Sequence, residues 1–79
     1  MQITLKLLAT YRKLLPSNAE GNKIVLEISE ETSVSNLMVK FNVPQDESSV
    51  ILLNGATVPL LTMLKDGDTV TAFSAIAGG

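Results

Sequence analysis

The sequence predicts an α+β domain of 79 residues, in which one main helix packs on one face of a mixed sheet of four to five strands. Two early segments alternate apolar and polar residues, a pattern typical of strands with one solvated face. A later segment has apolar residues at helical spacing, and two turn signals divide the remainder into short strands. Because one amphipathic stripe can cover one sheet face, a single helix on a single sheet is the economical arrangement.

Two strands and a short helical insertion are expected in the N-terminal third. Residues 3–7, with the sequence Ile-Thr-Leu-Lys-Leu, alternate strictly, and a second alternation places Ile24, Leu26 and Ile28 on one face. Two alternating segments this close in sequence favour an antiparallel pair. Between them, residues 10–22 predict a short helix and then a loop, because proline, asparagine and glycine interrupt the second half of this segment.

One apolar stripe predicts the main helix. Its members stand at i, i+3, i+4 and i+7: Val34, Leu37, Met38 and Phe41. Ser33 stands just before the stripe, where its hydroxyl can accept from the unpaired N–H groups of the first turn, and Glu30 and Glu31 lie near the positive end of the helix dipole. Pro44 is expected to end the helix by Val43. We interpret the stripe as core packing rather than as a cofactor contact.

Three further strands are expected in the second half of the chain. Residues 50–53 form an apolar strand candidate, and the dipeptide at residues 54–55, Asn-Gly, tolerates the positive φ angles of a tight hairpin turn. Residues 58–59 are then expected to form a short return strand. A second turn signal at residues 65–68, Lys-Asp-Gly-Asp, leads into the last strand at residues 69–74.

Composition excludes most kinds of catalytic site. The chain contains no Cys and no His, which removes thiolate nucleophiles, disulfides and the commonest metal ligands. Asp66 and Asp68 flank Gly67 in a turn, with no third ligand within easy sequence reach. A chain this short buries only about 60% of its unfolded surface, so little remains for a deep cleft. We therefore expect no bound metal or cofactor, and a partner-binding module rather than an enzyme.

Charge and hydropathy point to a soluble cytoplasmic protein. Six basic and eight acidic residues give a formal net charge of -2, and no long basic run suggests nucleic acid binding. The longest apolar run, residues 50–53, is far shorter than the ~20 residues that span a bilayer. The N-terminus also lacks a basic region followed by an apolar signal core. Neither a nucleic acid nor a membrane is expected as a partner.

The last residues of the sequence, 74–79, are uncharged and are expected to form a flexible tail. Since glycine has no side chain, a terminal Gly-Gly can enter a narrow channel that any Cβ atom would block. The terminal carboxylate is therefore a candidate reactive group, although an incidental Gly-Gly ending is the alternative. Ile76 is the bulky member and is expected to fill an apolar slot, or else to fold back onto its own core. The residues expected to enter a partner are Ala75, Ile76, Ala77, Gly78 and Gly79.

An aromatic residue close to the tail is a candidate docking anchor. If Val70 faces the core, Ala72 shares its face, and Phe73 points toward the uncovered side of the sheet. Large rigid side chains dominate interface energetics, so Phe73 is expected to contact a partner unless a bulge turns it into the core. Leu8 and Val25 lie on the off-core parity of their strands and are expected to extend the same apolar patch.

The residues 64–68, Leu-Lys-Asp-Gly-Asp, precede a strand and then residues 76–79, Ile-Ala-Gly-Gly. In this order the C-terminal third resembles the MoaD/ThiS family of ubiquitin-like sulfur carriers. Asn54-Gly55 is similar to the hairpin of that family, and Ser33-Val34 with Leu37 is similar to its helix entry, so the resemblance extends over essentially the whole chain. It implies a β-grasp fold.

Within that family, residues 8–15 look most like the small subunit of molybdopterin synthase, whose first strand runs into a short helix. Thiamine-pathway carriers usually have a tighter first hairpin. The small subunit, however, usually carries a Pro-Pro pair just before its last residues, where this chain has Ser74-Ala75. A carrier for a molybdenum or tungsten pterin, thiamine, cysteine or tRNA pathway therefore stays open.

The resemblance also implies a chemistry for Gly79. An adenylyltransferase related to ubiquitin-activating enzymes would join its carboxylate to AMP, and a sulfur donor protein would convert the product to a thiocarboxylate. In the molybdopterin branch, the large synthase subunit would receive the tail and accept the sulfur. ATP belongs to the activating partner, so this chain would hold no cofactor and have no activity alone. The alternatives are a ubiquitin-like modifier joined through Gly79 to target lysines, and a plain interaction domain.

Overall fold

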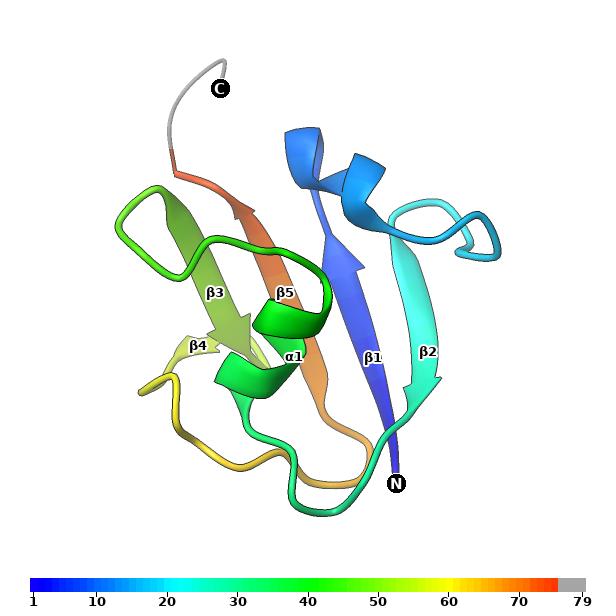
Figure 1. Ribbon diagram of the computed structural model, residues 1–79, viewed down its shortest axis with the longest axis vertical. Helices are drawn as coiled ribbons and strands as arrows, with labels where there is room; N and C mark the ends of the chain where they lie inside the picture. Colours follow the sequence, from blue (N-terminus) through cyan, green and yellow to red (C-terminus); the bar gives the residue numbers. More distant parts are fainter. Residues whose placement is uncertain (76–79) are drawn as a thin grey trace.

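The computed structural model describes residues 1–75 and shows a sheet crossed on one face by a short helix (Figure 1). Its strands are β1 (Gln2–Leu7), β2 (Lys23–Glu27), β3 (Ser49–Leu53), β4 (Ala56–Thr57) and β5 (Thr69–Ser74). The α-helix α1 (Val34–Lys40) follows β2, and a 3-10 helix, η1 (Ala9–Leu14), follows β1. The predicted order of strand, strand, helix, strand, short strand and strand is confirmed.

The sheet is mixed, with the strand order β2-β1-β5-β3-β4. Strand β1 pairs antiparallel with β2, as predicted, and parallel with β5, so that Leu5 lies opposite both Ile24 and Val70. Strand β3 pairs antiparallel with both β4 and β5. The first and last strands, β1 and β5, therefore lie side by side, with β2 beyond β1 on one side and β3 and β4 beyond β5 on the other.

The core lies between the sheet and α1. Alternate residues of the two central strands are buried, as period-2 side-chain geometry requires: Ile3, Leu5, Leu7, Val70 and Ala72. From the helix, Val34, Leu37 and Met38 are at most 1% exposed, and Phe41 packs against the same cluster. The interpretation of the helical stripe as core packing is confirmed.

Helix α1 begins with a reciprocal capping box. Asn36 donates its backbone N–H to the Ser33 hydroxyl at 3.1 Å, and the Asn36 side-chain oxygen accepts the Ser33 N–H at 3.0 Å. The Val34 and Ser35 N–H groups donate to the backbone of residues 60–62. Since the first N–H groups of a helix have no partner within it, these contacts fix where α1 begins and hold the 60–62 segment against it.

Helix α1 ends at Lys40, before the limit that Pro44 sets. Asn42 adopts a left-handed backbone conformation with φ 60°, and Val43 donates its N–H to the Met38 carbonyl at 2.9 Å. This bond closes a Schellman motif and satisfies a carbonyl of the last turn. The buried Val43 thereby continues the apolar surface of the helix without being helical.

Two short elements lie elsewhere than the sequence predicts. The return strand is Ala56–Thr57 rather than residues 58–59, because the two-residue turn at Asn54-Gly55 lets pairing resume at once. Val58 instead packs half-buried against the core. The short helix in the insertion begins at Ala9, one residue earlier than predicted, and is a 3-10 helix.

Replacing Leu37 with Ala should lower the free energy of unfolding by about 2 to 5 kcal/mol, because it removes a fully buried side chain and leaves a cavity. Val39→Ala is the matched control, since Val39 lies on the same helix but is 64% exposed. We expect a change within about 0.5 kcal/mol for this control. Urea unfolding of both variants measures the difference, and equal losses would contradict the assigned helix face.

Candidate functional site

Helix α1 covers one face of the sheet (Figure 1). The opposite face, here called the open face, carries the residues that alternate with the buried ones along the strands. Along β5, Val70 and Ala72 are fully buried beneath α1. The residues that follow each of them, Thr71 and Phe73, are partly exposed. The predicted parity of β5 is therefore confirmed. Phe73 lies on the open face, next to the point where β5 ends.

An apolar patch occupies one end of the open face. Phe73 pairs with Val50 across β5 and β3, and the register of Leu7 with Ala72 brings Leu8 beside Phe73. The core of the described residues is built without these side chains. Leu52 lies two positions along β3 from Val50, within diagonal reach of Phe73. The apolar patch therefore consists of Leu8, Val50, Leu52 and Phe73.

The predicted docking residues fall in two places. Leu8 and Phe73 are adjacent, as expected, but Val25 lies on the edge strand β2, where it pairs with Thr4. Thr4 precedes Leu8 by four residues along the chain, which corresponds to about 13 Å at the usual strand rise. Val25 is 59% exposed and does not join the apolar patch.

Val50 and Leu52 were not predicted as site residues. Residues 50–53 are all apolar, so alternation could not show which of them face the core. The signal that could have separated them is the Asn54-Gly55 turn, since a two-residue hairpin fixes the register of β3 against β4.

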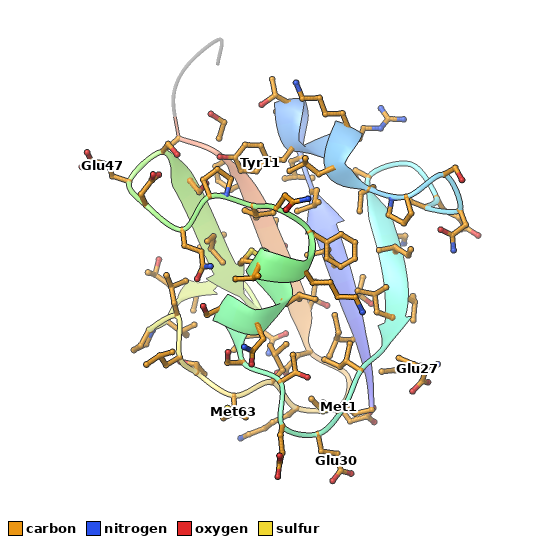
Figure 2. The ribbon with its side chains drawn as sticks, in the orientation of Figure 1. Met1, Tyr11, Glu27, Glu30, Glu47 and Met63 are labelled. Carbon is orange, nitrogen blue, oxygen red and sulfur yellow. The ribbon has the colours of Figure 1, made fainter. Side chains whose placement is uncertain are left out.

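The last described residue is held at a defined place, which we call the tail base. Ala75 donates its backbone N–H to the Ser48 carbonyl at 2.8 Å. The Tyr11 hydroxyl donates to the same carbonyl at 3.4 Å and lies 2.6 Å from the Ser49 hydroxyl. Figure 2 shows Tyr11 and Glu47 at the end of the sheet where β5 finishes. The 3-10 helix and the loop before β3 thus fix the start of the tail beside the apolar patch.

Asp46 supports the tail base through Ser48. Its carboxylate accepts both the hydroxyl and the backbone N–H of Ser48. These two hydrogen bonds, the hydroxyl first, lower the pKa of Asp46 below its usual value of 3.8. The ionised carboxylate therefore orders the loop whose carbonyl holds Ala75.

Of the predicted tail residues, Ala75 is exposed at the end of β5. The other four lie outside the described residues: Ile76, Ala77, Gly78 and Gly79.

The remaining carboxylates near the predicted turn have structural partners. Asp66 accepts the Gln2 backbone N–H at 2.7 Å, and Asp68 accepts from the Asn54 side chain and the Lys65 backbone. The turn interpretation of Asp66 and Asp68 is confirmed. Within residues 1–75, no three His, Cys, Asp or Glu side chains gather as a metal site would need.

No described helix is long and apolar enough to span a membrane.

This sheet, helix and element order define a small ubiquitin-like protein with the β-grasp fold. The model of the Mut7-C ubiquitin family matches residues 1–77, and the chain belongs to that family. No curated protein matches the sequence.

Solved structures of small ubiquitin-like proteins superpose over nearly the whole chain. SAMP1 from Haloferax volcanii is 16% identical with a TM-score of 0.74, and each chain is covered to 100%. The proposed molybdopterin converting factor subunit 1 of Pyrococcus furiosus is 25% identical with a TM-score of 0.74, covering 95% of this chain and 98% of that one. The HVO 2177 protein of Haloferax volcanii is 22% identical with a TM-score of 0.79, covering 100% and 87%. The resemblance to MoaD/ThiS-like ubiquitin-like proteins and the β-grasp prediction are confirmed.

Lowering the pH should weaken the tail base through Asp46. Because its pKa is lowered by folding, its contribution to stability is complete above 3.8 and is lost as the pH falls through the lower folded value. We expect the difference in unfolding free energy between wild type and Asp46→Asn to stay constant from about pH 7 to about pH 5 and to shrink below 3.8. Urea unfolding at several pH values measures it. A difference that grows on acidification would contradict the assigned role.

Proposed function

We propose that this protein is a ubiquitin-like sulfur carrier that acts through a thiocarboxylate on Gly79. The observation that carries the proposal is the position of the tail base: β5 ends there, beside an apolar patch, and in the sequence four residues follow Ala75 up to Gly79. Fully extended, four residues reach about 13 Å. A partner that covers the open face could therefore hold the reactive carboxylate within its own active site.

The proposed chemistry needs no reactive side chain on this protein. The Gly79 carboxylate attacks the α-phosphorus of ATP, the bond to pyrophosphate breaks, and an acyl adenylate forms. A donor sulfur then attacks the acyl carbon, the bond to the AMP oxygen breaks, and AMP leaves. Where the donor is a persulfide, a thiol must then reduce the S–S bond to release the thiocarboxylate. A chain without Cys can thus carry sulfur on its own terminal carbonyl.

Three kinds of protein partner follow from this chemistry. An adenylyltransferase related to ubiquitin-activating enzymes binds ATP and adenylates Gly79. A sulfur donor protein supplies the sulfur, and an acceptor takes it from Gly79. We propose the cytoplasm as the place of this chemistry, because ATP and sulfur donors are both available there.

For the acceptor, we propose a molybdopterin synthase large subunit, in a pathway to a molybdenum or tungsten cofactor. The likeness to the proposed Pyrococcus furiosus converting factor subunit supports this branch. So does η1, since a short helix directly after the first strand is the feature expected of that branch.

A second candidate function is protein modification through an isopeptide bond between Gly79 and a lysine. It is favoured by the likeness to SAMP1 of Haloferax volcanii, also described as small archaeal modifier protein 1. Both functions need the same adenylated glycine, so the product on Gly79 distinguishes them.

Mass spectrometry of the tryptic peptide 66–79 should show one oxygen replaced by sulfur after treatment with ATP, the activating enzyme and a sulfur donor. The peptide contains neither Met nor Cys, so side-chain oxidation cannot imitate this gain. Deletion of Gly79, or Gly78→Val, should abolish the gain with an unchanged Tm, because β5 ends before both residues. Wild type without ATP is the control. A lysine-linked peptide would support the modifier, and an unmodified tail would contradict both functions.

Replacing Phe73 with Glu should raise the KM of the activating enzyme for the carrier by about tenfold or more, since it places a charge in the apolar patch. The matched control is Val39→Glu, which adds the same charge to an exposed apolar position on α1. Steady-state ATP–pyrophosphate exchange measures both KM values, and thermal unfolding checks that both variants fold. Equal KM values for the two variants would exclude the open face as the docking surface.

A further inference from the structure

We infer that the partner surface that covers the open face is apolar at its centre and carries at least one carboxylate, which pairs with Lys6 and its neighbour Lys23. This inference rests on the proposed function, since it specifies the surface of the activating enzyme that docks there. It follows from the register of β1 and β2, from the charges on the open face and from the position of the apolar patch.

Two lysines lie directly opposite each other on the open face. Lys6 of β1 and Lys23 of β2 are Cα partners in an antiparallel pair, so their side chains leave the sheet on the same side. Directly opposed like charges destabilise a sheet. The protein therefore keeps an unfavourable pair although its net charge is only -2 and acidic residues are in excess.

The described part of the chain offers little to offset these charges. Residues 1–75 contain one ion pair, which joins the N-terminal ammonium group of Met1 to Glu27 at 3.8 Å. Glu27 lies four residues from Lys23 along β2, about 13 Å away at the usual strand rise. Glu20 faces Lys23 across an isolated bridge but makes no ion pair with it. Lys6, which is nearer to the centre of the sheet, has no acidic neighbour in register.

The lysine pair adjoins the apolar patch. Lys6 pairs with Thr71 on β5, and the next residues on the same face of the two strands are Leu8 and Phe73. A partner that buries Leu8 and Phe73 must therefore come close to the Lys6 ammonium group. Removing that group from water without an opposite charge is costly, so a stable complex needs a carboxylate at this position.

Charge reversal at Lys6 tests the inference with the activating enzyme as the probe. In ATP–pyrophosphate exchange, Lys6→Glu should raise the KM for the carrier by about tenfold with little change in kcat, and Lys23→Glu should act in the same direction. Raising the salt concentration should increase the wild-type KM, and this dependence should be weaker in the variants. The matched control is Lys65→Glu, which makes the same change of charge in the exposed turn before β5 and should leave KM unchanged.

Stability separates this role from a structural one. Lys6→Glu places opposite charges across β1 and β2, so its Tm should rise by about 1 to 6 °C while binding weakens. A fall in Tm together with a raised KM would instead assign Lys6 to the fold and overturn the inference.

Carbodiimide coupling provides a direct readout, because it joins lysine amines to carboxylates that touch them. Peptides that link Lys6 or Lys23 to an Asp or Glu of the activating enzyme are expected. Coupling through Lys40 or Lys65 alone, or equal KM values for Lys6→Glu and Lys65→Glu, would overturn the inference while leaving the proposed function intact. If the wild-type carrier supports no pyrophosphate exchange, the proposed function itself fails.

Discussion

The parallel pairing of β1 with β5 is the constraint on which the rest of this structure depends. It joins residues 4–7 to residues 69–72 and puts the two strands that are farthest apart in sequence at the centre of the sheet. Parallel neighbours need a long crossover connection. Since β1 is the first element and β5 the last, all the other elements belong to this connection. The same pairing places Leu8 beside Phe73 and so assembles the apolar patch from opposite ends of the chain. Neither residue would form this surface on its own strand.

The two faces of the sheet differ in the residues that they carry. One face is filled by α1 and by the alternate residues of the central strands, and it accounts for the core. The other face carries the apolar patch and the lysine pair, neither of which the core requires. Contiguous apolar patches with polar residues around them mark interaction surfaces in many proteins. This division explains how so small a domain can have an apolar patch on one face and a complete core on the other.

Sequence patterns predicted most of the fold, because the period-2 alternation of β1 and the helical stripe of α1 each leave a distinct signature. They also predicted the open-face position of Phe73 from its parity relative to Val70. The sequence patterns did not predict residues in a run that is entirely apolar, or contacts between residues far apart in the sequence. The apolar run of β3 hid Val50 and Leu52, and the grouping of Val25 with Phe73 was wrong because strand order decides which off-core residues become neighbours. The tail base joins Tyr11 to Ser48 and Ser49 over more than thirty positions, which local patterns do not encode.

The central pairing also has a consequence for the order of events during synthesis. The ribosome synthesises the chain from the N-terminus, so β1 and β2 emerge long before β5, the other neighbour of β1, has been made. The sheet has no complete centre until residue 72 has been made, and contacts of such high sequence separation form late and slowly. An unfinished or damaged chain would therefore lack both the apolar patch and a fixed tail base. Under the proposed function, an activating enzyme that binds the open face would therefore adenylate only chains that have finished folding.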